Sequence, residues 1–527
     1  MRSNNRNVFK YIFIIVVIAL VIGAIYILYY QSNKKEVAKE GTVTDVSQTS
    51  DEISVSKNIK MGISNYDTMN PILTKNKEIA NIDKLIFEPL VNITSDYRTE
   101  NCLAKQINKV SDTKYEIKLD TSIKWQDGKD FFSKDVEFTI NKIKENQGLY
   151  AENVSHIQSI ETPDSETVIL NLDTPVSNFE YDLDFPLLSS SYYANEDFAT
   201  SSKIPIGTGM YKIASIDDNN ILLITNDRWR NIKSQAPKTE SIEIKRVSAI
   251  GEVFNSFKLG NIDVITTYKS NYTDYVGTMG YNKKEIPGRY FDFISFNCND
   301  DILSDVSVRK CISVALNKEN LVSSVFSNNK IVANSPLDYG SYLFDSKYNA
   351  KNDVNDAKQI LQENDWQYVN GRWQKTINGH VRKLIISLMI NDDNSDRNLV
   401  AENIKSQLAD IGIVVNIIRV SSDTYYNNLN NKNYQMALCG IVNSVKPDLS
   451  YFYGMGNIAN YNNSDVQNAI NNLDSYNDIQ KIVSNDCPYI GLYRNKITIL
   501  LNANVGGNFT PNAFFSYYHF NEWYKQQ

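Results

Sequence analysis

An uncharged apolar run near the start of the chain constrains this protein more than any other stretch of its sequence. The run extends from Tyr11 to Tyr30 and covers 20 residues. As a helix it would rise about 1.5 Å per residue, or roughly 30 Å, which is the thickness of a bilayer core. Arg2, Arg6 and Lys10 precede it without any acidic residue. The positive-inside rule therefore places the N-terminus in the cytoplasm and the rest of the chain outside.

The residues around this run favour an anchor that is not cleaved. No Ala-x-Ala pattern follows it, and no cysteine near its end is available for a lipid. A buried core helix is the alternative, but the run is too long and too purely apolar for one. We therefore predict a single-pass protein of the cell membrane with a large extracytoplasmic domain at the cell surface. Its parts would be a cytoplasmic tail over 1–10, a transmembrane signal anchor over 11–30 and a flexible polar tether over 31–56.

The composition is that of a folded protein and limits its partners. Hydrophobic residues make up 42% of the chain and charged residues 22%, which is usual for globular domains. The 54 basic and 61 acidic residues give a net charge of −7. Proteins that bind nucleic acid usually carry a basic surface, so this balance argues against nucleic acid as a partner.

Residue types that serve catalysis or metal binding are present, but without the spacing that such chemistry needs. The HExxH, GxSxG and P-loop patterns are absent from the sequence. The five cysteines form no CxxC pair, which argues against a zinc or thioredoxin-type site: Cys102, Cys298, Cys311, Cys439 and Cys487. The three histidines lie far apart: His156, His380 and His519. We therefore expect no catalytic residue, no metal site and no cofactor.

The stretch 122–144 gathers four acidic residues and a tryptophan around an Asp-Gly pair, which raises the question of a carboxylate site. Asp127 and Gly128 form a strong turn signal between extended segments. Ser133 is a good N-cap, and an acid at Asp135 suits the first turn of a helix. The following residues give that helix an apolar side: Val136, Phe138, Ile140 and Ile143. We therefore interpret these acids as structural rather than catalytic.

The second half of the chain alternates strands and helices, as an α/β fold does. Residues 383–390 and 413–420 are apolar runs that predict strands, and a helix between them ends at Gly412. This order favours a parallel pair of strands with a right-handed crossover. The intervening helix is expected to bury Leu399, Ile404, Leu408 and Ile411. Within 305–326 a second apolar helical side comprises Val308, Cys311, Ile312, Ala315 and Leu316.

Several stretches in order across residues 85–495 resemble the extracytoplasmic solute-binding proteins, family 5, of ABC importers for oligopeptides, dipeptides or nickel. "IFEPL" is similar to that family's YEGL element, and the stretch after it runs into the Asp-Gly turn and a T/S-x-x-D-V motif. "IPIGTGMYKI" is similar to P-V-G-T-G-P-Y, and "FKLGNIDVI" resembles L-x-x-G-E-I-D. "FNCNDDILSDVSVRKCISVALNKE" resembles a longer family motif in which Arg309 takes the second arginine position, and "NDAKQILQENDW" resembles A-K-x-L-L-x-E-A-G.

This resemblance implies a two-lobed α/β fold of the periplasmic-binding-protein type II, in the large peptide-binder subclass with an extra subdomain. Lobe I would comprise 57–96, 205–290 and 491–527. The inserted subdomain would span 97–204, and lobe II would span 291–490.

The resemblance also implies a function without a catalytic step. The lobes would close on a solute, most simply an oligopeptide, and deliver it to the permease and ATPase subunits of an ABC importer. The protein would act as a monomer. Two alternatives stay open: a surface receptor of the same fold that senses a solute, and an extracytoplasmic peptidase.

The binding residues follow from the same resemblance. Peptide binders of the family have a tryptophan and an aspartate shortly before a proline, and the aspartate holds the α-amino group of the peptide. Here Pro447 matches the proline, the aspartate position falls on Asn443 or Ser444, and the tryptophan is absent. The ligand is then a peptide held by main chain and aromatic side chains, or another polar solute. The residues predicted to bind it are Thr74, Lys75, Thr267, Tyr268, Cys439, Gly440, Ile441, Val442, Asn443 and Asp448, the last as a substitute for the missing aspartate.

Overall fold

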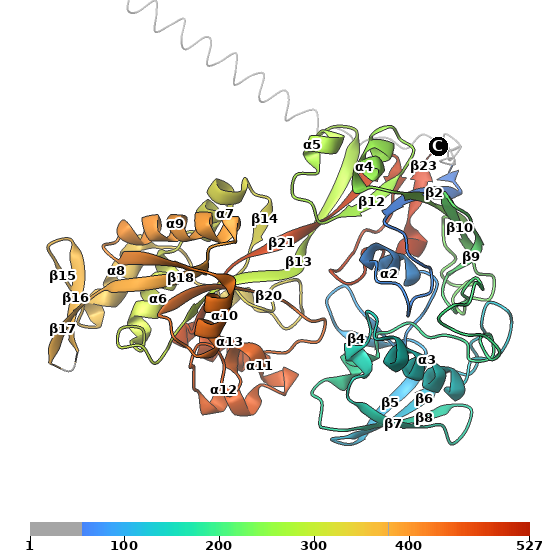
Figure 1. The fold of residues 1–527 in the computed structure, drawn as a ribbon, viewed down its shortest axis with the longest axis horizontal. Coiled ribbons are helices and arrows are strands. Elements are labelled where there is room, and N and C mark those ends of the chain that lie inside the picture. The colour runs from blue at the N-terminus through green and yellow to red at the C-terminus, as the bar shows by residue number, and fades with distance from the viewer. Residues whose placement is uncertain (1–54, 378, 527) are drawn as a thin grey trace, which may run out of the picture. The chain divides into compact units, whose positions relative to one another are not determined.

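The computed structural model describes residues 55–377 and 379–526 (Figure 1). The predicted tail, the predicted anchor over 11–30 and nearly all of the predicted tether lie outside these residues. Among the helices of the described part, none is long and apolar enough to cross a membrane. The last two residues of the predicted tether form a strand, β1 (Val55–Ser56), which pairs with β23 (Tyr524–Gln526) near the end of the chain.

An eleven-stranded mixed sheet organises the described chain. Its strands follow the order β19-β18-β20-β13-β21-β12-β2-β11-β10-β9, and β14 also pairs with β21. We call one end of it the first lobe, built on β2 (Asn58–Ser64), β9 (Tyr211–Ile216), β10 (Asn220–Thr225), β11 (Ser241–Val247) and β12 (Val264–Thr267). We call the other end the second lobe, built on β14 (Lys330–Val332), β18 (Ile385–Asn391), β19 (Val414–Val420) and β20 (Met436–Val442).

Two long antiparallel strands, β13 (Tyr281–Phe296) and β21 (Tyr489–Asn502), run through both lobes (Figure 1). Their pairing breaks where the lobes join: Pro287 pairs with Lys496, and the next pair is Phe291 with Arg494. Asn495 faces this break, and its Oδ1 accepts a hydrogen bond from Tyr290 N at 2.9 Å. We call residues 287–291 and 494–496 the junction. Strand pairing therefore restrains the relative movement of the two lobes least at these residues.

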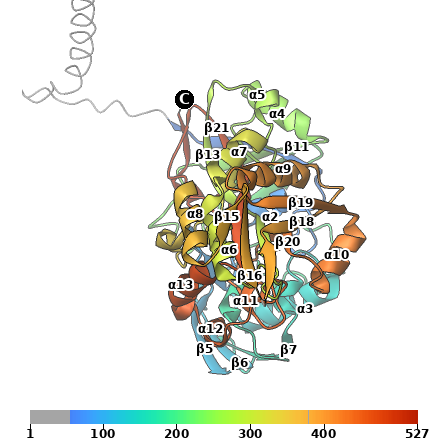
Figure 2. The ribbon, with the colours of Figure 1, turned by 90° about the vertical axis from the view of Figure 1, so that its left-hand side faces the viewer.

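The second lobe has helices on both faces of its strands, because alternate residues of a strand point to opposite faces. In β20, Met436 and Leu438 pack into one core, whereas Ala437 and Cys439 pack into the other. The first core includes α6 (Val306–Ala315), α7 (Lys318–Phe326), α8 (Val354–Glu363) and α9 (Ser395–Ala409). The second includes α10 (Ser422–Asn430), α11 (Ser450–Tyr453), α12 (Ser464–Ala469) and α13 (Tyr476–Asp486). Figure 2 looks onto this lobe and shows its strands among these helices.

The predicted strand-helix-strand unit is present: β18 and β19 are parallel, and α9 connects them. Ile404 and Leu408 are buried as predicted, but the prediction for Leu399 is wrong, since it is 57% exposed. Successive helical residues are about 100° apart, so Val400 and Ala401 lie on the side of Ile404 and Leu399 does not. All five apolar residues predicted within 305–326 are buried.

A four-stranded sheet shares one hydrophobic core with the first lobe. Its order is β5-β6-β8-β7, and its strands are β5 (Ala104–Ser111), β6 (Lys114–Leu119), β7 (Ile157–Glu161) and β8 (Thr167–Leu172). Helix α3 (Ser133–Asn146) belongs to this part, and α2 (Lys77–Asp83) follows β2 in the first lobe. The remaining elements are α4 (Ile250–Lys258), α5 (Thr273–Val276), β3 (Val91–Ile93), β4 (Thr99–Asn101), β15 (Gln367–Val369), β16 (Arg372–Ile377), β17 (His380–Lys383) and β22 (Val505–Gly506).

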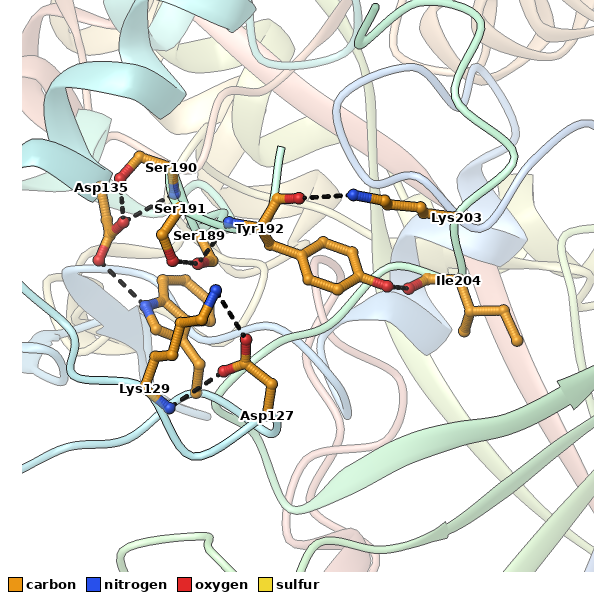
Figure 3. A network of polar contacts seen from close by, with 10 residues as sticks. Asp127, Lys129, Asp135, Ser189, Ser190, Ser191, Tyr192, Lys203 and Ile204 are labelled. Atoms are coloured by element: carbon orange, nitrogen blue, oxygen red, sulfur yellow. Dashed lines mark hydrogen bonds and ion pairs between the residues drawn. The ribbon is translucent and has the colours of Figure 1, made fainter. Parts of the chain in front are cut away.

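The acidic stretch 122–144 is structural, as interpreted. Gly128 has φ +88°, and Trp125 N donates to Lys129 O at 2.9 Å, which closes the predicted turn. Asp135 is wholly buried and accepts hydrogen bonds from Trp125 Nε1 at 3.0 Å and from Ser190 N and Oγ at 2.7 Å each (Figure 3). The N-cap prediction is off by one residue: Phe132 caps α3, because Asp135 accepts from its N–H and Ser133 Oγ donates to Asp164 O instead.

Candidate functional site

A cavity of about 570 Å³ lies at the junction, with walls from both lobes and from the segments next to the four-stranded sheet. This volume falls in the range of small-molecule and cofactor sites. The first lobe contributes residues of α2 and the segment after β12. The second lobe contributes the residues that end and follow β20. We call it the junction cavity; the residues used below are Lys77, Lys84, Glu152, Asp182, Asp184, Tyr268, Arg289, Tyr290, Val442, Ser444, Asn495 and Phe514.

Large apolar and aromatic side chains form part of its wall. Tyr268 is 47% exposed, Tyr290 38% and Val442 58%, and Phe514 is half-buried beside them. A contiguous group of exposed apolar side chains indicates an interaction site, and aromatic rings offer flat, rigid contact area with a hydrogen-bonding tip in tyrosine. This wall is suited to a ligand that has both apolar and polar groups.

Three of the six charged side chains that line the junction cavity form ion pairs: Lys84, Asp182 and Asp184. Lys84 Nζ lies 2.8 Å from Asp184 Oδ2. Asp182 Oδ2 lies 2.6 Å from the Nζ of Lys446, which follows β20 in the second lobe. Burial raises the pKa of Asp182, and the contact with Lys446 opposes this effect. Among the described residues, the other charged side chains of the wall form no ion pair: Lys77, Glu152 and Arg289.

A second contact between the lobes lies near the junction cavity and is aromatic. The rings of Tyr97 and Tyr339 meet edge to face with centroids 4.5 Å apart. Tyr342 N donates to Asp96 O at 3.0 Å, and the Arg98 guanidinium lies 3.8 Å from the Tyr342 ring centroid. The loop after β14 therefore packs on the hairpin between β3 and β4.

A buried arginine connects the junction to the segment that the sequence predicted as a peptide site. Arg494 is fully buried; its Nε lies 2.8 Å from Asp338 Oδ1, and its Nη1 donates to Asn443 Oδ1 at 2.8 Å. Its Nη2 also donates to the carbonyl oxygens of Ser335 and Pro336 at 2.9 Å each. The amide oxygen of Asn443, one of the two residues predicted at the position of the family aspartate, thus accepts a hydrogen bond within the protein.

The other predicted residues are spread over several surroundings. Tyr268 and Val442 line the junction cavity. Thr74 is buried and donates to Asp67 Oδ1 at 2.7 Å, and exposed Lys75 donates its N–H to Asp67 Oδ2 at 2.7 Å. The assignment of all ten residues to ligand binding stays a prediction.

Four of the ten predicted residues, including Val442, lie on β20, and one lies on β12. Cys439 is buried beside Tyr425 Oη, at 3.4 Å, and Gly440 and Ile441 are half-buried. Thr267, at the end of β12, is buried and accepts from Lys269 N at 3.1 Å.

Asp448 lines a neighbouring cavity of about 420 Å³, which shares Glu152, Asp182 and Ser444 with the junction cavity. Its Oδ1 accepts from Ser450 N at 2.7 Å. The acid after the proline therefore lies next to the junction cavity and does not line it.

Sequence reasoning missed Arg289, Asn495 and Phe514. A signal existed for the first of them, because the Pro287-Gly288 pair interrupts an otherwise regular strand and marks a break in its ladder. Nothing in the sequence marks Asn495 or Phe514, since they reach the cavity only through the long-range pairing of β13, β21 and the C-terminal segment.

The described residues contain no group of three His, Cys, Asp or Glu side chains that could hold a metal ion. The five cysteines are all free. The arrangement of the junction cavity is that of an enclosing site with aromatic and charged walls.

Comparison with known sequences gives a family. A family model described as bacterial extracellular solute-binding proteins, family 5 Middle, matches residues 98–463, more than half of the 527 residues. A protein of Brucella ovis is 24% identical over 361 residues, 64% of this chain and 64% of its own length. The chain thus matches slightly less than two thirds of that relative. The oligopeptide-binding protein AppA of Bacillus subtilis is 23% identical over 479 residues, 83% of this chain and 86% of AppA.

Comparison with solved structures gives the fold. The periplasmic murein tripeptide binding protein MppA, in an unliganded open form, superposes with a TM-score of 0.74 at 15% identity and covers 90% of this chain and 98% of its own. A nickel ABC transporter protein of Bacillus halodurans gives a TM-score of 0.74 at 18% identity, over 88% of this chain and 98% of its own. The two-lobed α/β architecture is therefore that of these binding proteins.

Proposed function

The chain belongs to family 5 of the bacterial extracellular solute-binding proteins, and we propose that it captures peptides outside the cell for an ABC importer. It would enclose the peptide between its lobes and deliver it to the permease, while the ATPase subunits drive transport. It would do so as a monomer and without a catalytic step.

One observation carries this proposal: the junction cavity has walls from both lobes and lies at a break in the two strands that join them. A rotation at this break would open and close the cavity, which is the hinge movement of binding proteins that enclose their ligands. The aromatic wall suits peptides, because tyrosine and phenylalanine rings can pack on side chains of many kinds. The name of AppA as an oligopeptide-binding protein supports the same ligand class.

Thermal unfolding of the full chain in detergent tests the ligand class. A ligand at a hundredfold over its Kd adds about 2.7 kcal/mol to the free energy of unfolding, which raises Tm by a few degrees for a chain of this size. We expect this shift with a pool of three- to six-residue peptides and no shift with sugars. A shift with nickel salts and none with peptides would contradict the proposal.

We further propose that residues 11–30 anchor the protein in the membrane, with the large domain extracytoplasmic. The support is the length and purity of the apolar run together with the basic residues before it. Membranes from expressing cells should retain the full chain through an alkaline carbonate wash. A variant that lacks 11–30 should appear in the soluble fraction, and retention of that variant in the washed membranes would contradict the anchor.

A further inference from the structure

Arg289 differs from the other two cations of the junction cavity, because it is partly buried and has no carboxylate partner among the described residues. Lys84 has Asp184, and Lys77 is exposed to solvent. Among the described residues, none provides a carboxylate oxygen within 4 Å of the Arg289 guanidinium, although this side chain is partly buried. Burial lowers the pKa of Arg289, and an arginine still keeps its charge in a protein. The wall of the cavity thus contains one partly buried positive charge that the described residues do not neutralise.

Two contacts hold this guanidinium in place. Nε donates to Asn443 O at 2.8 Å, and the Phe514 ring centroid lies 4.6 Å from Cζ. The main chain is fixed as well, since Asn443 N donates to Arg289 O at 2.9 Å. These hydrogen bonds join β13 to the end of β20. Both the main chain of Arg289 and its planar guanidinium are therefore oriented before any ligand binds.

The terminal nitrogens Nη1 and Nη2 have no partner among the described residues and are not sealed from solvent. A guanidinium with both terminal nitrogens available offers two parallel N–H groups, and this is the geometry that a carboxylate accepts. An anionic group of the ligand would satisfy the donors and the charge together. A neutral amide at the same place could accept hydrogen bonds through its carbonyl oxygen, but it would leave the charge of the guanidinium without a counter-charge.

We propose that Arg289 is the subsite for the C-terminal carboxylate of a bound peptide, so that the peptide lies with its free C-terminus at the junction. This assignment rests on the proposed function in peptide capture. It makes the junction cavity selective for peptides with a free carboxylate over C-terminally blocked ones. It also places the N-terminal part of the peptide toward other parts of the junction cavity, whose wall includes Glu152 and Asp182.

The test compares one peptide pool in two forms, with a free carboxylate and with a C-terminal amide, on the full chain by isothermal titration calorimetry. We expect the acid pool to bind about 10- to 100-fold more tightly, the usual effect of hydrogen bonds to a charged group. The overall electrostatic attraction would have the opposite effect. The protein carries a net charge of −7, and amidation removes a negative charge from the peptide, so the amidated pool is attracted more strongly. Arg289→Gln should remove the preference by weakening the acid pool alone, and Arg289→Lys should keep part of it.

Arg382→Gln is the matched control, because it makes the same substitution at an exposed arginine that does not line the junction cavity, and it should keep the full preference. Equal affinity of wild type for both pools would overturn the subsite while leaving peptide capture intact. An equal loss of both pools in Arg289→Gln would also overturn it, since that pattern means a general disturbance of the site. Failure of wild type to bind either pool would overturn the proposed function, and the subsite with it.

Discussion

Lys446 Nζ lies 2.6 Å from Asp182 Oδ2, although 264 residues separate the two in the chain. Lys446 follows β20 in the second lobe, and Asp182 belongs to the helical turn Phe179–Leu183, which packs on the hairpin of β3 and β4. The side chains are 20% and 16% exposed, so solvent screens the pair only in part. This ion pair joins the second lobe to the rest of the protein across the cavity.

Lys446→Ala should therefore favour the open arrangement of the lobes. It leaves Asp182 partly buried without its cation, which we expect to cost about 1–3 kcal/mol. Small-angle scattering of the ligand-free protein should show a larger radius of gyration, and peptide should dissociate faster. Arg382→Ala is the control, because it breaks an exposed pair with Asp301 and should change neither quantity. An unchanged radius of gyration in Lys446→Ala would contradict a role in closure.

Gly288→Ala should destabilise the junction. An added Cβ would lie 2.4–2.6 Å from Oδ1, Nδ2 and Cγ of Asn495, and that side chain also accepts from Tyr290 N. Overpacking of this kind typically costs about 1–3 kcal/mol, measured by urea unfolding. Gly251→Ala in α4 is the control, since a Cβ there meets nothing within 4 Å, and it should be neutral or stabilising. Equal stability of the two variants would show that Asn495 can move aside.

Asp292 should make stability depend on pH below neutrality. Burial raises its pKa to about 7, and the Arg397 guanidinium, 3.7 Å away, opposes this rise. Unfolded aspartate has a pKa of about 3.9, so between pH 4 and 7 the folded protein holds a proton that the unfolded chain has lost. Stability from this group is therefore present below pH 4 and is lost as pH rises to 7, at a slope of at most about 1.4 kcal/mol per pH unit.

Urea unfolding of wild type and Asp292→Asn at pH 5, 6 and 7 measures this slope. The asparagine variant should lose less stability with rising pH than wild type. Asp301→Asn, at an exposed position, should keep the wild-type slope. Parallel curves for wild type and Asp292→Asn would mean that Asp292 is ionised throughout this range.

Asp135→Asn should weaken the fold without changing ligand binding. The carboxylate accepts from Trp125 Nε1, from Phe132 N and from Ser190, and an amide must turn an N–H toward at least one of these donors. We expect a loss of about 1–3 kcal/mol in urea unfolding with peptide affinity unchanged. Asp130→Asn serves as the control, because Asp130 is 67% exposed. A loss of peptide affinity in a folded Asp135→Asn protein would revive a functional role for this acid.

Local patterns predicted much of the fold because they depend on near neighbours in the chain. The helical side that contains Val308 and Cys311 and the parallel pair over 383–420 follow from the spacing of apolar residues alone. Errors arose at single positions such as Leu399, which is apolar but lies outside the narrow buried face of its helix. The order of the family motifs then supplied the two-lobed architecture that the spacing could not.

The candidate site depends on contacts between distant parts of the chain, which local sequence patterns do not predict. Arg494 and Asn443 are 51 residues apart, and their hydrogen bond exists only because β21 and the end of β20 lie on either side of β13. Cys439 and Gly440 were expected near the ligand from their place before Pro447, yet Cys439 faces the buried layer of α10 because strand residues alternate.

The sequence by itself determined the apolar run over 11–30, the α/β class, the family and the structural role of the acids in 122–144. The tertiary structure decided which charged side chains form ion pairs and which have no oppositely charged partner. Whether Arg289 has a carboxylate partner depends on segments far from it in the chain, and so does the exposure of Tyr268 and Phe514 in one cavity. The physical reason is that burial and pairing are properties of the neighbours in space, and β13 and β21 bring these neighbours together only when both lobes have formed.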